Sequence, residues 1–269
     1  MFKLIKLEWS KFSKNTVITL LFIFFLLFFP ALLYFGSIMP ENLPPMVPSK
    51  TTFYSFPGIW EYLGYAGTWV VYFFLGVLVI YTVTIEVVNK TLRQAIINGM
   101  TRNEFFASKF INVLLLASLA TIYYVIIALA IGFYNTDGAT LSAALENEWA
   151  IPRFFLMSLA YMSFALFFAY VFRKSGIAVF SYLSFVLLIE PLIKWLSINY
   201  IHKSRIFNFL PMNATEDLMP FPFFKFADSV PNEIDFEFLL TYTEASITVS
   251  LYIVLAIGIS YWLFTKKDI

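Results

Sequence analysis

The sequence predicts an all-α, polytopic membrane protein with six transmembrane helices. Hydrophobic residues make up 60% of the 269 residues, charged residues only 13%, and the mean hydropathy is +0.79. The apolar residues gather in runs of about 20, which as helices can cross a hydrocarbon core of about 30 Å and satisfy their own backbone polar groups. A transmembrane barrel would instead show short alternating segments. The expected spans are residues 17–35, 62–85, 110–133, 154–172, 177–196 and 246–264.

The distribution of Lys and Arg predicts that both termini are cytoplasmic. An even number of spans places the two termini on one side, and 12 of the 18 basic residues fall on that side. Cytoplasmic loops carry the excess of basic residues in membrane proteins. The twelve are Lys3, Lys6, Lys11, Lys14, Lys90, Arg93, Arg102, Lys109, Arg173, Lys174, Lys266 and Lys267.

Residues 1–15 predict an amphipathic helix that lies in the cytoplasmic interface. Phe2, Ile5, Trp9 and Phe12 share one helical face, with Lys and Ser turned away from it. A basic flank that only orients the first span would show the same residues. The apolar run that follows is longer than the core of a secretory signal and has no small-residue cleavage site after it, so we expect it to be retained as a span.

Residues 86–109 form a polar, basic connection between the second and third spans, and they predict a short helix-turn-helix. Helical periodicity continues past the second span through Arg93 and Ile97. The pair Asn98-Gly99 then supplies residues that readily adopt the left-handed conformation that closes a helix. We therefore expect the second span to continue as a helix up to this pair.

The second half of this connection carries a capping-box spacing. Thr101 stands three residues before Glu104, so the two can cap a new helix that leads through Lys109 into the third span. An ordinary capped turn between two spans has the same spacing. However, about 24 residues are more than such a turn needs, and a basic projection from the membrane favours a partner there.

The connection at residues 197–240 is rich in Phe and Pro and too apolar for a freely solvated loop. Asn213, followed three residues later by Glu216, predicts an N-cap and a short helix that lies on or dips into the outer leaflet. A loop that covers the helix bundle is the alternative.

The residue inventory argues against an enzyme. None of the 10 glycines precedes a Lys, so no phosphate-binding loop is present, and there is no Cys. The lone His202 is expected to be solvated or interfacial. Glu190 is the one intramembrane candidate for a translocation path, although it could instead pair with Lys194 beside a kink at Pro191.

The order of elements and residues 86–109 resemble the membrane subunit of the type-2 family of ABC exporters. In that family the loop between spans two and three reads as a Glu, then Gly-Thr-Leu-Arg, then a Gly or Pro turn, then Ser-Arg or Thr-Arg and a later Lys. Lys90 stands where a Gly would be usual. The residues that match are Glu86, Thr91, Leu92, Arg93, Gly99, Thr101, Arg102 and Lys109.

The resemblance implies one permease domain, residues 1–269, that moves a hydrophobic or amphipathic substrate out of the cell by alternating access. A separate ABC ATPase subunit, which would hold ATP and Mg, would dock on the 86–109 connection as a cytoplasmic coupling helix. A second permease protomer, identical or different, would complete a dimer in a bacterial inner (plasma) membrane, and no nucleic acid is expected as a partner. The expected ATPase-coupling residues are Glu86, Thr91, Arg93, Gly99, Thr101, Arg102, Glu104 and Lys109.

The translocation path would lie at the dimer interface, with Glu190, Phe223 and Phe224 along it. The alternative function is a non-transporting membrane anchor or assembly subunit whose cytoplasmic connection recruits a partner protein. An intramembrane enzyme is the third reading, and the residue inventory disfavours it.

Overall fold

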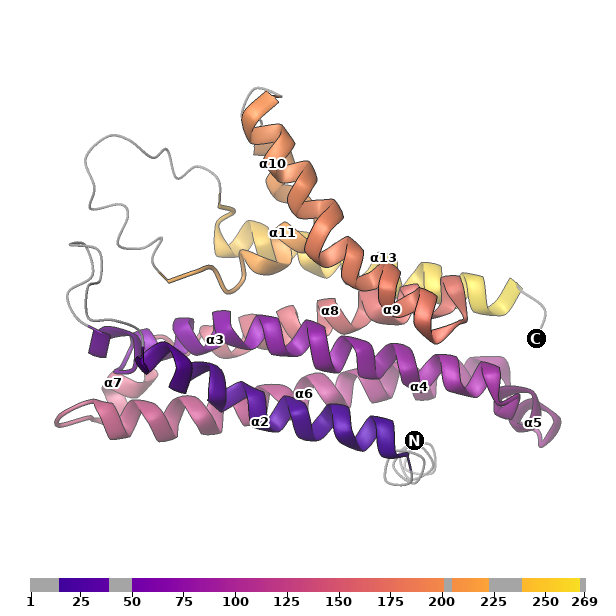
Figure 1. Ribbon diagram of the computed structural model, residues 1–269, viewed down its shortest axis with the longest axis horizontal. Helices are drawn as coiled ribbons and strands as arrows, with labels where there is room; N and C mark the ends of the chain where they lie inside the picture. Colours follow the sequence, from indigo (N-terminus) through magenta and orange to yellow (C-terminus); the bar gives the residue numbers. More distant parts are fainter. Residues whose placement is uncertain (1–14, 39–49, 201–204, 223–238, 267–269) are drawn as a thin grey trace.

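The computed structural model describes residues 15–38, 50–200, 205–222 and 239–266, and these residues form helices and connections without a strand. The long helices run side by side in an elongated bundle (Figure 1). The helices are α2 (Thr16–Ile38), η1 (Lys50–Phe53), α3 (Gly58–Val70), η2 (Val71–Gly76), α4 (Val77–Val88), α5 (Thr91–Ile97), α6 (Arg102–Asn135), α7 (Leu141–Leu145), α8 (Ala150–Phe172), α9 (Ser175–Ser184), η3 (Phe185–Ile189), α10 (Glu190–Tyr200), η4 (Arg205–Phe209), α11 (Pro211–Glu216) and α13 (Tyr242–Lys266).

Six helical stretches of the described chain are long and apolar enough to cross a membrane, which confirms the predicted fold class. Each expected span lies within the helices α2, α3–α4, α6, α8, α9–α10 or α13. The predicted interfacial helix falls almost entirely on residues 1–14, outside the described residues.

The helix α8 forms the centre of the bundle and packs against α13, α6, α4, α9 and α3. Small residues on α8 allow this close approach, since Ala160, Ala165 and Ala169 are fully buried. Tyr124 of α6 stacks on Phe154 of α8, with ring centroids 4.2 Å apart. The Tyr124 hydroxyl also donates to the carbonyl of Trp60 at 2.6 Å, so one aromatic side chain joins spans two, three and four.

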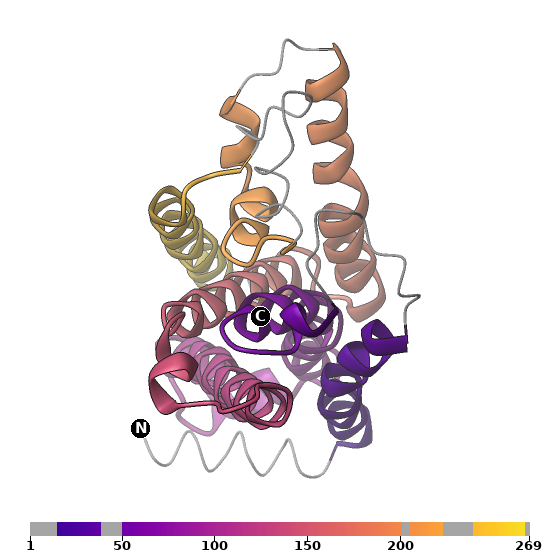
Figure 2. The same ribbon diagram turned by 90° about the vertical axis from the view of Figure 1, so that its left-hand side faces the viewer.

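The fifth span leans away from the bundle. In Figure 1, α9 and α10 form one long helix whose α10 end rises clear of the other spans, and Figure 2 shows α10 and α11 on one side of the bundle. The π-helical turn η3 ends at Ile189, two residues before Pro191, which cannot donate the hydrogen bond of a regular helix. Much of the apolar surface of η3 and α10 is therefore exposed, including Leu188 of η3 and Leu192 and Trp195 of α10.

Gly67 provides a prediction on packing. A Cβ atom at this position of α3 would lie 2.5 Å from the Phe29 ring and 2.7 Å from the Phe154 ring, so the glycine lets α2, α3 and α8 meet. We expect Gly67→Leu to lower the free energy of unfolding by about 1–3 kcal/mol, because overpacking a filled core forces its neighbours apart. Gly258→Leu is the control, since nothing lies within 4 Å of a Cβ there. Thermal unfolding of the two variants in detergent should differ; equal midpoints would contradict the packing.

Candidate functional site

The connection between α4 and α5 turns sharply instead of continuing the helix. The helix α4 ends at Val88, and Lys90 adopts a left-handed conformation with φ of 56°. The Lys90 N–H donates to the Val87 carbonyl at 3.2 Å, and the Thr91 hydroxyl donates to the Glu86 carbonyl at 3.3 Å. The prediction of one helix running on to Ile97 is therefore wrong. Helical periodicity does not reveal a break when a non-glycine residue makes the left-handed turn.

The end of α5 agrees with the sequence-based expectation. Gly99 has φ of +94°, the Gly99 N–H donates to Ile96, and the Met100 N–H donates to Ala95. These two bonds form a Schellman motif, which satisfies the last carbonyls of the helix. The predicted left-handed closure at Gly99 is confirmed.

The start of α6 is held by the predicted capping box. The Glu104 N–H donates to the Thr101 hydroxyl at 3.2 Å, and the Thr101 N–H donates to the Glu104 carboxylate at 2.8 Å. The two reciprocal bonds satisfy amide groups that a helix start leaves without partners. The connection between α5 and α6 is thus fixed at both of its ends.

Glu86 and Lys109 lie inside the bundle rather than on the surface of the connection. Their side chains form an ion pair between α4 and α6, and their residues are 6% and 2% exposed. The Lys109 amino group also lies 5.3 Å from the centre of the Phe105 ring. Sequence reasoning singled out both residues, but nothing in their spacing indicated that they pair. Their place in the fold makes them positioning residues that fix α4 against α6.

Arg102 and its neighbours join the start of α6 to the end of α13. The Arg102 guanidinium donates to the Thr265 carbonyl at 2.8 Å, and the Tyr261 hydroxyl donates to Asn103 at 3.0 Å. The Phe105 ring stacks on Phe264 at 5.5 Å. Arg102 therefore makes a contact within the chain, while Arg93 on α5 is exposed.

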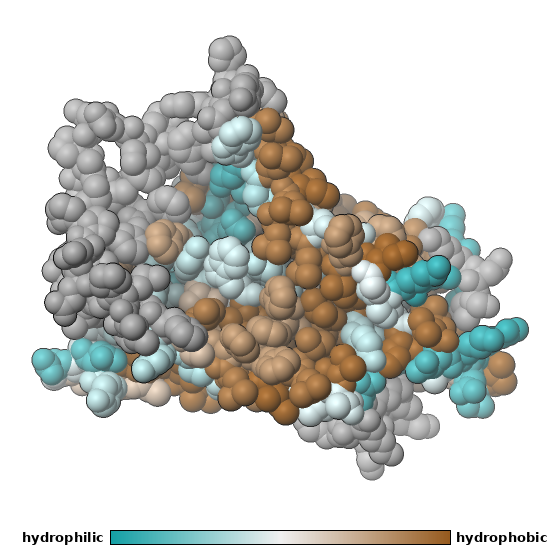
Figure 3. All heavy atoms as spheres, viewed as in Figure 1, coloured by the Kyte–Doolittle hydropathy of each residue, from teal (hydrophilic) through white to brown (hydrophobic). Residues whose placement is uncertain are grey.

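The helix α5 lies at the far tip of the bundle, at the end where α4, α8 and α13 finish; we call this end the α5 end (Figure 1). Its inner face packs through Leu92, which is 6% exposed, and through Ile96. Thr91 and Arg93 are exposed, and Ile97 is 75% exposed. Figure 3 shows teal, hydrophilic side chains gathered at this end, beyond a brown apolar surface along the bundle. The Schellman motif at Gly99, the capping box at Thr101 and the buried Leu92 thus hold α5 in place. Its exposed side presents a small surface that is partly apolar and partly basic.

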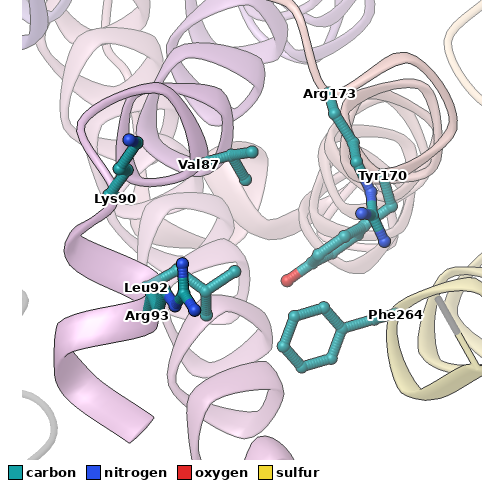
Figure 4. A pocket seen from close by; sticks show the side chains of 7 residues that line it. All are labelled: Val87, Lys90, Leu92, Arg93, Tyr170, Arg173 and Phe264. Atoms are coloured by element: carbon teal, nitrogen blue, oxygen red, sulfur yellow. The ribbon is translucent and has the colours of Figure 1, made fainter. Parts of the chain in front are cut away.

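A pocket of about 160 Å³ lies behind α5, between it and the ends of α8 and α13. Figure 4 shows Leu92 and Arg93 on one side of it and Tyr170, Arg173 and Phe264 on the other. Arg173 follows the last residue of α8 and has φ of 55°. The sequence marked Arg173 only as one of the basic residues that orient the spans, and gave no sign that it shares a pocket with Arg93. The described lining residues are Val87, Lys90, Leu92, Arg93, Tyr170, Arg173 and Phe264.

Comparison with protein families identifies the family of this chain. The family described as ABC-2 family transporter protein matches residues 4–190, well over half of the 269 residues and including the whole α4–α6 connection. The chain belongs to the ABC-2 transporter family. It is a permease subunit of an ABC transporter, a membrane component that usually has no catalytic activity of its own and that associates with an ABC ATPase and membrane lipids. Comparison with curated proteins gives no match.

At the opposite end of this permease, the Glu190 side chain caps α11, a helix to which Glu190 does not itself belong. Its residue is 1% exposed, and its carboxylate accepts the Asn213 N–H of α11 at 2.7 Å. The helix α11 begins at Pro211, so Asn213 lies within its first turn, and the prediction of Asn213 as the N-cap is wrong. Pro211 starts the helix, and a distant carboxylate supplies the cap. Among the described ion pairs, Glu190 has none with Lys194.

The other residues predicted for the translocation path, Phe223 and Phe224, lie outside the described residues, as does His202. The described part of the same connection packs on the bundle, where the Phe221 ring lies 4.9 Å from the Tyr65 ring of α3. The last described part of this connection thus lies against α3, and a place for Phe223 and Phe224 along a path stays a prediction.

The Asp217 carboxylate holds the same connection in place, and its burial predicts that stability depends on pH. The residue is 3% exposed, and its carboxylate accepts the Leu240 N–H at 2.9 Å. Burial raises the pKa of Asp217 from 3.8 to about 6, against the lowering effect of the Leu240 hydrogen bond and of Lys194. The folded protein therefore binds more protons than the unfolded chain between these values, so this group's contribution to stability falls as pH rises from about 4 to about 6. Between about pH 4 and pH 6, the thermal midpoint of Asp217→Asn should fall less steeply with rising pH than that of the wild type. An equally steep fall in both proteins would contradict the burial of Asp217.

Proposed function

We propose that the permease is the exporter subunit of an ABC transporter and that a separate ABC ATPase, which holds ATP and Mg, docks on α5. The observation that carries the proposal is the exposed tip helix, capped at its end and fixed inward by Leu92. A coupling element must present a surface to its partner and must be rigid enough to transmit movement. The exposed Ile97 and Arg93 supply an apolar anchor and a charged contact of the kinds that dominate protein interfaces.

Two contacts would carry movement of α5 into the membrane. The ion pair between Glu86 and Lys109 joins α4 to α6, and the Arg102 bond to Thr265 joins α6 to α13. A push on α5 would therefore reach spans two, three and six together. This arrangement supports alternating access, in which the transmembrane path opens to one side of the membrane at a time.

The direction of transport and the partner protomer rest on the resemblance of residues 86–109 to exporters. A second permease protomer, identical or different, would face the apolar surface of the spans, and the path would lie between the two. Exposed side chains such as Leu188 of η3 and Leu192 and Trp195 of α10 suit either a protomer or lipid. The aromatic-rich spans suit a hydrophobic or amphipathic substrate, and the membrane would be a bacterial inner membrane.

Purification of the permease from its native membranes tests the proposed function. We expect a captured chain with a G-x-x-x-x-G-K-[ST] motif and ATP hydrolysis that a transported substrate stimulates. Capture of a cytoplasmic protein without this motif, together with an absence of ATP hydrolysis, would favour a membrane anchor or assembly subunit.

The orientation predicts where fused reporters will appear. Because 12 of 18 basic residues sort to one face, reporters placed after Lys174 and after Ile269 should read cytoplasmic, and one near Asp217 should read external. The α5 end would then face the cytoplasm, as ATPase docking requires. A cytoplasmic signal at Asp217 would overturn the orientation.

A further inference from the structure

The pocket behind α5 combines positive charge with apolar walls. Lys90, Arg93 and Arg173 contribute three cations, and the other lining side chains are apolar or aromatic. None of the described residues that line the pocket is acidic. Such a mixture fits a ligand that has an anionic group joined to an apolar body, since Arg binds phosphate through a planar fork of donors.

The backbone at this pocket adopts an unfavourable conformation twice. Lys90 and Arg173 are the two non-glycine residues with positive φ in the described chain, and both line the pocket. Glycine adopts this conformation more readily than any other residue, because it has no Cβ atom. Both residues stand at helix ends, Lys90 between α4 and α5 and Arg173 directly after α8, and these turns bring their cationic side chains to the same pocket.

The position of the pocket matches the boundary between hydrocarbon and lipid headgroups. Its walls come from the last residues of α4, α8 and α13, which are three membrane-spanning helices. Apolar side chains next to the lining residues are exposed, Val88 at 61% and Phe172 at 38%. On α13 the Lys266 amino group lies 5.3 Å from the ring centre of Trp262, and Trp is a residue enriched at membrane interfaces.

We propose that this pocket binds the phosphate of an anionic phospholipid from the leaflet at the α5 end, with the acyl chains along the exposed apolar side chains of the spans. The volume of 160 Å³ is roughly ten times the 10–15 Å³ that one water needs, so it admits a phosphate group. An acidic side chain of an ATPase fits less well, because the pocket lies behind α5 and not on its outer face. A bound headgroup would join α5 to the ends of α8 and α13.

Lipid binding by the purified full-length permease tests this proposal without any ATPase. Native mass spectrometry in detergent would compare dioctanoyl phosphatidylglycerol with dioctanoyl phosphatidylcholine, and inorganic phosphate would serve as a competitor. Both lipids carry a phosphate, but the trimethylammonium group of phosphatidylcholine would be repelled by Lys90, Arg93 and Arg173, so we expect about tenfold tighter binding of phosphatidylglycerol. Arg93→Gln should lose most of this preference, and Lys174→Gln, an exposed neighbour outside the pocket, should keep it.

The Arg173→Gly variant separates binding from a role in the turn. Glycine is favoured at a positive φ, so its thermal midpoint in phosphatidylcholine should be equal to or above that of the wild type, while the preference for phosphatidylglycerol is lost. Equal binding of the two lipids by the wild-type protein, or an unchanged preference in both Arg variants, would overturn the proposal. Displacement of phosphatidylglycerol by inorganic phosphate of equal affinity would overturn the lipid as the source of the anion.

Discussion

Replacing Lys109 by Met should lower the free energy of unfolding by about 3–5 kcal/mol, because it leaves the Glu86 carboxylate buried without its cation. Glu86→Gln should destabilise the protein in the same sense by leaving the Lys109 ammonium without its carboxylate. Thermal and denaturant unfolding of the purified protein in detergent would measure both effects.

The double variant Glu86→Gln with Lys109→Met tests whether the losses in the two single variants come from one ion pair. Removing both charges takes away the cost of an uncompensated buried ion, so the double variant should recover much of the lost stability. Lys174→Met serves as a control at an exposed position and should unfold as the wild type does. Additive losses in the double variant would contradict an ion pair between α4 and α6.

Introducing a charge at Ile97 should reduce capture of the ATPase about thirtyfold without unfolding the permease. Ile97 is 75% exposed at the tip of α5, and loss of an anchor at the centre of an interface costs about 2 kcal/mol or more. Gly99→Val should act on the same surface indirectly, because a β-branched residue at φ of +94° would distort the turn that ends α5. Co-purification of the ATPase with Ile97→Asp and Gly99→Val would measure the loss.

The matched control for Ile97→Asp is Tyr134→Asp. Tyr134 is 88% exposed near the end of α6, at the opposite end of the bundle, so its charge should leave capture unchanged. Arg102→Ala separates docking from transmission: its guanidinium contacts Thr265 within the chain, so we expect capture to persist while substrate-stimulated ATP hydrolysis falls. Equal capture by wild type and Ile97→Asp would contradict docking on α5.

Local patterns predicted the parts of this fold that local interactions decide. The capping box at Thr101 and Glu104 and the left-handed Gly99 depend on residues within one turn of each other, and both are confirmed. The six spans follow from apolar length, because a helix is the structure that satisfies an isolated backbone in hydrocarbon.

Contacts between distant residues could not be predicted in the same way. The pairing of Glu86 with Lys109 depends on the relative rotation of α4 and α6, which no single spacing determines. The cap that Glu190 provides to α11 joins residues 23 apart, and it replaced the expected cap at Asn213. Lys90 misled the prediction of α5 for a different reason, since a Lys in a left-handed turn carries no signal that a Gly would give.

Site-specific cross-linking from α5 tests the docking of the ATPase most directly. The chain contains no Cys, so Ile97→Cys introduces a unique thiol on the outer face of α5, and Tyr134→Cys introduces one at the opposite end. With a short thiol-reactive cross-linker added to the intact complex, Ile97→Cys should form a covalent adduct with the ATPase, more strongly when nucleotide is bound, and Tyr134→Cys should form none. An ATPase that co-purifies with the permease but cross-links to neither thiol, or to Tyr134→Cys alone, would contradict coupling through α5.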